Sequence, residues 1–129
     1  MKIVPMYNKS LVKIIFQQVD HSVNVIKRRF NEIHHYSDFY NSDKGIDLLD
    51  AICMQLIAIG ESIKNVDKIT NKSLLYNYPN IDWKGIMGIR DIISHHYFDI
   101  DAEEIFNVCK NELDKLQSTI NVIIDDFKF

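Results

Sequence analysis

Apolar residues recur every three or four positions along three long segments, which is the spacing of one face of an α-helix. The segments are Val12–Ile33, Leu49–Val66 and Cys109–Phe127. In the second segment the steps alternate between three and four residues, as in a helix packed against near-parallel neighbours. No stretch of the sequence alternates convincingly with the period of a strand. The pattern therefore predicts an all-α protein.

Shorter elements complete this picture. Residues 35–45 are polar and aromatic and predict a connection with one short turn of helix. Residues 71–78 predict a short helix that ends at Pro79. Asp82 can cap a fourth helix that begins at Trp83 and runs through Ile93. The expected architecture is an up-and-down bundle of four main helices plus a short one.

The last helix carries a start signal of its own. Asp101, with Glu104 three residues later, forms a candidate capping box. The apolar positions that follow predict one helix from this cap to Phe127.

Length and composition restrict the protein class. The chain has 129 residues, 47% of them hydrophobic, with two prolines and four glycines, so we expect one globular domain over residues 1–129. Its apolar runs fall far short of the roughly 20 residues that cross a bilayer. The N-terminus lacks the features of a secretory signal, which predicts a cytoplasmic protein.

Several kinds of chemistry find no support in the sequence. Cys53 and Cys109 have apolar neighbours and fit buried thiols better than a disulfide or a metal site. The five histidines do not follow metal-ligand spacing, so we expect neither metal nor cofactor. Gly85 and Gly88 lie inside a predicted helix, where we interpret them as lowering bulk so that another backbone or a long ligand can approach.

The segment after Gly88 is the richest in chemistry. It combines Arg90, one of three arginines, with His95, His96 and Tyr97. Histidine can exchange a proton near neutral pH, and arginine pairs with phosphate oxygens. Such a set suffices for metal-free RNA cleavage, in which a base activates the 2′-hydroxyl and a cation stabilises the phosphoryl charge. The structural alternative is a salt bridge of Arg90 and an interaction of His95 with the helix dipole.

The spacing of the two groups sets a geometric condition. Arg90 and His95 lie five residues apart, so an unbroken helix would separate them by about 140° around its axis. Either the helix ends near Ser94 and His95 swings round, or Arg90 of one chain works with His95 of another. We expect helix termination combined with dimerisation.

The arrangement Arg90-x4-His95-x-Tyr97 resembles the Arg-x4-His-x-Tyr signature of HepT-like toxins, which belong to the HEPN ribonuclease superfamily. The resemblance covers roughly residues 8 to 127. Its other parts, in order, are Ile59-Gly60-Glu61, Tyr78-Pro79-x-Ile81-x-Trp83, Gly88-x-Arg90-Asp91 and Phe98-x-Ile100-Asp101.

The resemblance implies an all-helical homodimer that acts as a metal-independent endoribonuclease toxin, with the two motifs lining a shared cleft. By position, Arg90 would stabilise the phosphate and His95 would be the general base or acid. Asp91 would orient one of them, and Glu61 would position the motif loop. An MntA-like nucleotidyltransferase antitoxin would add AMP to a tyrosine, for which Tyr97 is the candidate. RNA is the expected substrate, with no DNA.

One position departs from the family pattern. Family members commonly carry glycine between the motif histidine and tyrosine, whereas this chain has His96. His96 is therefore a candidate second proton-transfer group beside His95. A catalytically silent module that only docks a nucleotidyltransferase is the alternative function.

The net charge of −3 requires any RNA-binding charge to be concentrated locally. Two candidates are the run Lys27-Arg28-Arg29 and the pair Lys64 and Lys68, four residues apart. Each could equally be a solvated helix face. The aromatic residues Tyr36, Phe39 and Tyr40 could stack on bases or close the bundle.

Overall fold

A computed structural model describes residues 7–95, 98 and 101–127 of the chain. These residues form helices and contain no strand, which confirms the all-α prediction. The elements in chain order are α1 (Lys9–Phe30), η1 (Tyr36–Phe39), α2 (Asp43–Ile69), η2 (Leu75–Asn77), α3 (Trp83–His95), α4 (Ala102–Asn107), the π-helical segment η4 (Val108–Glu112) and α5 (Leu113–Asp126).

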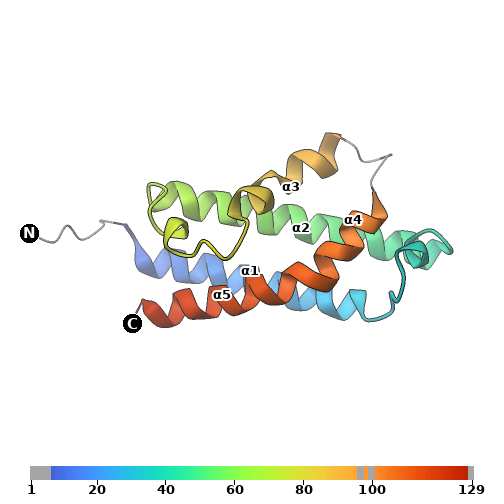
Figure 1. Cartoon of the computed structure of the whole chain (residues 1–129), viewed down its shortest axis with the longest axis horizontal. Coiled ribbons are helices and arrows are strands. Elements are labelled where there is room, and N and C mark those ends of the chain that lie inside the picture. The colour runs from blue at the N-terminus through green and yellow to red at the C-terminus, as the bar shows by residue number, and fades with distance from the viewer. Residues whose placement is uncertain (1–6, 96–97, 99–100, 128–129) are drawn as a thin grey trace, which may run out of the picture.

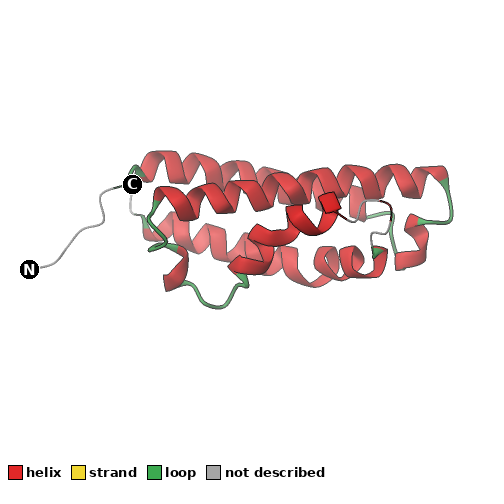
Figure 2. Ribbon diagram, turned by 90° about the horizontal axis from the view of Figure 1, so that it is seen from above, coloured by secondary structure: helices red, strands yellow, loops and turns green. Residues whose placement is uncertain are grey.

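The long helices run up and down an elongated bundle (Figures 1 and 2). Helix α1 packs against α2 and α5, and α3 packs against α2. The last helical stretch, α4–η4–α5, returns along the bundle towards the end where α1 begins (Figure 1). None of the helices among the described residues is long and apolar enough to cross a membrane.

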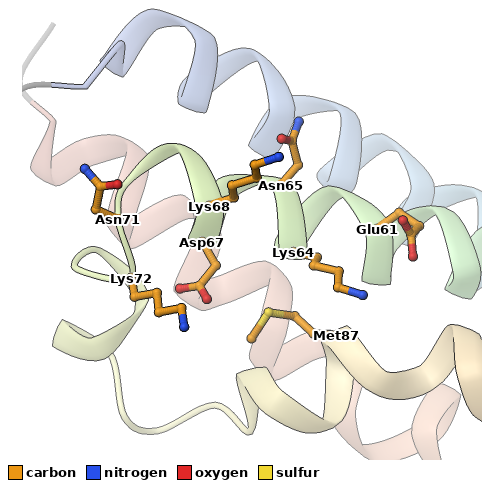
Figure 3. A pocket seen from close by; sticks show the side chains of 8 residues that line it. All are labelled: Glu61, Lys64, Asn65, Asp67, Lys68, Asn71, Lys72 and Met87. Carbon is orange, nitrogen blue, oxygen red and sulfur yellow. The ribbon is translucent and has the colours of Figure 1, made fainter.

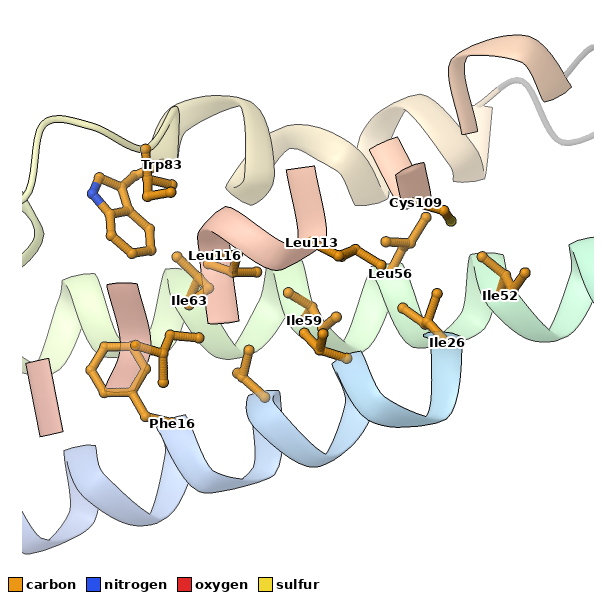
Figure 4. Packing of buried hydrophobic residues seen from close by; sticks show 14 of the residues in the cluster. Phe16, Ile26, Ile52, Leu56, Ile59, Ile63, Trp83, Cys109, Leu113 and Leu116 are labelled. Atoms are coloured by element: carbon orange, nitrogen blue, oxygen red, sulfur yellow. The ribbon is translucent and has the colours of Figure 1, made fainter. Parts of the chain in front are cut away.

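The apolar stripes predicted from the sequence form the core. Phe16 on α1, Ile63 on α2 and Ile120 on α5 are fully buried, and the stripes of all three helices meet between them (Figure 4). Removing these side chains from water supplies the main driving force for packing the bundle.

The structure also locates the helix ends. Asp82 accepts a hydrogen bond from the Gly85 backbone N–H at 3.0 Å and caps α3, as predicted. Asp101 caps α4 by accepting from the backbone of Glu103 and Glu104, so the Asp101 half of the predicted capping box is present. The short turn expected within residues 35–45 is η1.

Two boundaries differ from the prediction. Helix α1 ends at Phe30, and Ile33 is buried beyond it in a turn in which its backbone N–H donates to the Phe30 carbonyl. The apolar period therefore continues past the helix itself. Of residues 71–78, only Leu75–Asn77 form a short 3₁₀ turn.

The predicted last helix contains a π-helical segment around Cys109. Ile105, Cys109 and Leu113 are all buried, although they follow one another in two successive steps of four. A regular α-helix would rotate the third of them about 80° away from the first. The wider π turn offsets that rotation and keeps all three facing the core.

Both cysteines are free and buried in this core, as predicted. Burial raises the pKa of Cys53 to about 11 and that of Cys109 to about 12. Both thiols are therefore protonated at neutral pH and unreactive.

Candidate functional site

The candidate site begins at a close approach of α3 to α2. A Cβ atom at Gly60 would lie 2.8 Å from the Ile86 carbonyl oxygen and 3.0 Å from Cγ2 of Ile89. Only a glycine at this point of α2 leaves room for α3. The close approach sets Glu61, the next residue on α2, opposite Arg90 on α3.

These two residues form an ion pair across the helices. Nη1 of Arg90 lies 3.3 Å from Oε1 of Glu61, with the side chains 53% and 41% exposed. The Glu61 Oε1 atom itself is buried and accepts no hydrogen bond from the described residues. Because the pair is half exposed, it is worth at most about 1 kcal/mol of stability. Its main consequence is positional, since Arg90 is held while half of its side chain faces solvent.

The other motif residues lie near the end of α3. Asp91 is exposed, one position beyond Arg90, and no ion pair or hydrogen bond joins the two. Helix α3 stays helical through His95, one residue beyond the end expected near Ser94. Positions 90 and 95 thus keep their separation of about 140° around the axis. His96 and Tyr97 lie outside the described residues.

A second face of α3 borders an apolar groove. This groove, about 240 Å³ in volume, separates α3 from the α4–η4–α5 stretch. Ile86, Ile89 and Ile92 line one side, and Val108, Leu113 and Leu116 line the other. Ile92 is half exposed there, so α3 leaves apolar surface uncovered within a single chain.

Within the described residues no other backbone approaches either glycine of α3, so one half of our interpretation of them is wrong and the approach of a long ligand stays a prediction. A Cβ at Gly85 would meet the Asp82 carboxylate that caps the same helix, and a Cβ at Gly88 would meet no atom within 4 Å. The glycine that permits helix approach is Gly60, which we had predicted only as part of a motif. Its signal was a glycine among the buried positions of a long helix, where it lowers helix propensity.

A polar groove adjoins the ion pair on the side towards the end of α2 (Figure 3). It encloses about 990 Å³ and begins at Glu61. Its remaining lining residues are Lys64, Asn65, Asp67, Lys68, Asn71, Lys72 and Met87. The groove thus connects the predicted pair of lysines to Glu61, the ion-pair partner of Arg90, and adds Lys72, which helical spacing could not predict because it lies beyond the helix.

The other candidate basic cluster is engaged within the fold. Lys27 forms an ion pair with Asp114 and donates to Oε1 of Gln117 at 2.7 Å. Arg29 donates to the Ala51 carbonyl at 3.4 Å. These contacts tie α1 to α5 and α2, so only Arg28 of the run lies fully on the exposed side.

The aromatic candidates serve the end of the bundle. Phe39 is completely buried, and the Tyr40 hydroxyl accepts a hydrogen bond from the Ala102 backbone at the start of α4. The Tyr36 ring lies 4.3 Å from that of His35. Of the two roles open to these residues, the structure supports closing the bundle for Phe39 and Tyr40, whereas the role of Tyr36 stays a prediction.

Metal ligation has no support in the described part of the chain, where no three histidine, cysteine or acidic side chains are grouped to hold an ion. The chemistry available around α3 is that of a half-exposed guanidinium, a paired carboxylate and neighbouring lysines.

Comparison with known proteins agrees with this picture. The chain is 33% identical over 78 residues to "Putative RNase MJ0127" of Methanocaldococcus jannaschii, a match covering 60% of this chain and 61% of that protein. It is 27% identical over 120 residues to "Putative RNase MJ1216" of the same organism, covering 93% and 89% of the two chains. "Putative RNase MJ0125", from the same organism, is 27% identical over 120 residues and covers 93% of each.

No solved structure matches the chain. A family model does, and it spans most of the bundle, including α2 and α3 with Glu61 and Arg90. Residues 19–123 match the family described as Ribonuclease HepT-like, and the chain therefore belongs to the HepT-like ribonuclease family.

Proposed function

We propose that the protein is a metal-independent endoribonuclease and the toxin of a toxin–antitoxin pair. The observation that carries the proposal is Arg90, which a chain of a ribonuclease family presents half exposed on α3, five residues before His95. A permanent planar cation at this place can pair with phosphate oxygens.

In the proposed reaction, His95 removes the proton from the 2′-hydroxyl of RNA. The 2′-oxygen then forms a bond to the adjacent phosphorus while the bond from phosphorus to the 5′-oxygen breaks. Arg90 stabilises the charge on the non-bridging oxygens, and a protonated histidine returns a proton to the leaving 5′-oxygen. The products are a 2′,3′-cyclic phosphate and a 5′-hydroxyl. His96 is the candidate for the second proton transfer, and Asp91 for orienting Arg90 or His95.

We further propose that two chains share the site. Positions 90 and 95 lie on different sides of α3, and the apolar groove beside Ile92 leaves surface for a second copy to cover. A two-fold dimer would repeat each contact and bring Arg90 of one chain to His95 of the other.

Cleavage is tested with purified protein and mixed cellular RNA in the presence of a chelator. Arg90→Ala and His95→Ala should each reduce the rate at least about a hundredfold. Arg28→Ala and His21→Ala are matched controls, since both residues are exposed on α1, and they should cleave like the wild type. If the wild type leaves every RNA intact, the silent docking module replaces the enzyme as the function.

The shared site has its own test, because the two inactive variants can be mixed. In a mixed dimer, Arg90 from the His95→Ala chain would meet His95 from the Arg90→Ala chain. Random exchange would then restore roughly a quarter of wild-type activity, since half of the dimers would each carry one complete site. Absence of recovery after confirmed subunit exchange would contradict a site built from two chains.

The antitoxin proposal assigns AMP addition to Tyr97 by an MntA-like nucleotidyltransferase. Added negative charge and bulk in the motif that contains Arg90 and His95 would oppose RNA binding. Incubation with such an enzyme and ATP should add the mass of one AMP group and abolish cleavage. Tyr97→Phe should prevent the addition, whereas Tyr76→Phe should not, although Tyr76 is 85% exposed.

A further inference from the structure

The groove beside the Glu61–Arg90 pair carries more positive charge than the remainder of this acidic protein suggests. Lys64, Lys68 and Lys72 all line it, each exposed and each without an ion-pair partner among the described residues. The two acids in the lining are Glu61, already paired with Arg90, and Asp67. The groove therefore has a surplus of cations, although the whole chain has a net charge of −3.

The lysines are spaced at equal intervals. Residues 64 and 68 lie one helical turn apart on α2, and residue 72 follows four positions later in the sequence, beyond the helix end at Ile69. Like charges at this spacing repel one another and weaken a helix. An anion that carries several charges in a row would remove that repulsion.

The backbone of Lys72, the third of these lysines, has an unusual conformation. Asn71 and Lys72 have φ values of 53° and 63°, the left-handed region in which glycine is the least strained residue. The Lys72 backbone N–H donates to the Asp67 carbonyl at 2.8 Å and so closes the end of α2. The chain thus places a lysine, in a strained conformation, at the far end of the groove.

The groove is continuous with the proposed catalytic site. Glu61 lines its near end and contacts Arg90 at 3.3 Å, while Met87 of α3 forms part of its opposite wall (Figure 3). From position 61 to the end of α2 at Ile69 the groove extends roughly 12 Å along the helix, and Lys72 lies just beyond that end. That length corresponds to about three or four nucleotides at the helical spacing of one strand.

We propose that this groove is the track for the sugar–phosphate backbone of single-stranded RNA, leading away from the bond cut at Arg90. The inference rests on the proposed function, because it takes the scissile phosphate to lie at Arg90. Lys64, Lys68 and Lys72 pair with successive phosphates as point charges, which gives affinity without base preference. A single strand fits the chemistry, since its nucleotides can leave the A-form geometry for attack by the 2′-oxygen.

The experiment measures binding separately from cleavage. The probe is a fluorescent 12-nucleotide RNA in which every 2′-hydroxyl is methylated, so that it cannot be cut by the proposed reaction. Its affinity is measured by anisotropy over a range of salt concentrations, first with a Lys64→Gln, Lys68→Gln, Lys72→Gln triple variant. The control is Arg28→Gln, Lys110→Gln, Lys115→Gln, which removes as many exposed cations from outside the groove.

We expect the groove variant to bind at least about tenfold more weakly, with the slope of log K against log salt reduced by about two, since each lost phosphate contact on a single strand contributes about 0.7. The control should keep the wild-type slope. Equal slopes in the groove variant and the wild type, or equal losses in groove variant and control, would overturn the proposal. Tighter binding of a methylated duplex than of the single strand would overturn the choice of strand.

The experiments give different results if the groove proposal is wrong and if the ribonuclease proposal is wrong. If the wild type cleaves RNA and the groove variant cleaves a long strand with unchanged KM, the groove is not the track while the ribonuclease proposal stands. If no RNA is cleaved but the probe binds with the lysine-dependent slope, the track stands and the catalytic proposal fails. With both correct, the variant raises KM for a 12-nucleotide substrate and leaves kcat for a dinucleotide unchanged.

Discussion

The two groups of basic residues, one at the end of α1 and one on α2, have different surroundings in the structure. At the end of α1, Lys27 pairs with Asp114 and Gln117, and Arg29 holds the Ala51 carbonyl. Along the second half of α2, Lys64 and Lys68 face a groove and form no ion pair within the described residues. The first group fastens helices together, whereas the second leaves its charge available to a ligand.

The difference teaches that a count of charges in a sequence does not reveal their availability. Both groups read as basic patches on predicted helices, and each had a solvated face as its alternative. What separates them is the helix that lies opposite. Helix α5 presents acidic and amide partners to Lys27. Helix α3 presents only Met87 to the groove that Lys64 and Lys68 line.

A first prediction exchanges arginine and lysine at two positions, Arg90 on α3 and Lys68 in the groove. Arg90→Lys keeps the charge but loses the planar fork that would pair with a phosphoryl group, so we expect the rate of cleavage to fall about a hundredfold. Lys68→Arg should change it less than about threefold, since a point charge on a phosphate tolerates either cation. Single-turnover cleavage measures both, and equal losses would contradict the separate roles.

Arg90 can face solvent beside Glu61 because α3 packs closely against α2. A substitution at Gly60 tests whether this close packing is required. In Gly60→Ala the new methyl group meets the Ile86 carbonyl, which is backbone and cannot turn aside. We expect a loss of about 2 kcal/mol in the free energy of unfolding, or roughly 5–10 °C in Tm.

Gly88→Ala is the matched control for this change, because its methyl group meets no atom within 4 Å. It should raise stability by about 0.5–1 kcal/mol through helix propensity. Thermal unfolding followed by circular dichroism distinguishes the two. A Gly60→Ala variant as stable as the wild type would mean that α3 does not depend on this close approach.

A crossed pair of substitutions separates fastening from ligand binding directly. Lys27→Met removes an ion pair and a hydrogen bond in a half-exposed setting, so we expect a loss of about 0.5–1 kcal/mol with RNA affinity unchanged. Lys68→Met should keep stability within about 0.5 kcal/mol, because it also relieves repulsion from Lys64 and Lys72. Its RNA affinity should fall instead. Denaturant titration measures the stability of both variants, and anisotropy measures their RNA affinity. A loss of RNA affinity in Lys27→Met would contradict the separate roles of the two lysines.

The sequence predicted the helices well, since burial of a stripe imposes its own period. It placed the boundaries less well where tertiary packing decides them. Ile33 continues the stripe of α1 from a turn, because a buried side chain needs only to reach the core. The π-helical segment around Cys109 arises from register with the neighbouring helices, which no local propensity encodes.

In the candidate site, too, the local features were predictable from the sequence and the features set by tertiary packing were not. Arg90 and His95 were visible as residue types at a set spacing, but the partner of Arg90 depends on how α2 and α3 cross. Glu61 meets Arg90 only because Gly60 admits the Ile86 backbone. Lys72 joins the groove through a left-handed backbone that a helical pattern cannot foresee.

The smallest expected effect on stability concerns the connection between α1 and α2. Like Lys27, the side chain considered there holds parts of the fold together and does not face a ligand. The Asp38 carboxylate accepts hydrogen bonds from the backbone N–H groups of His34 and His35 at 2.8 and 3.0 Å. These bonds favour the charged form and lower the pKa of Asp38 from its usual 3.8.

A carboxyl group with a lowered pKa in the folded protein contributes stability above its unfolded pKa and loses it as the pH falls further. We therefore expect the stability contributed by Asp38 to decline below about pH 3.8. Asp38→Asn keeps an oxygen that can accept both bonds but carries no charge, so its stability should lack this part of the acid dependence. Urea unfolding of both proteins between pH 5 and about pH 2.5 should show their difference shrinking as the pH falls. A constant difference would mean that the geometry of the turn, rather than the charge of Asp38, fastens this end of the bundle.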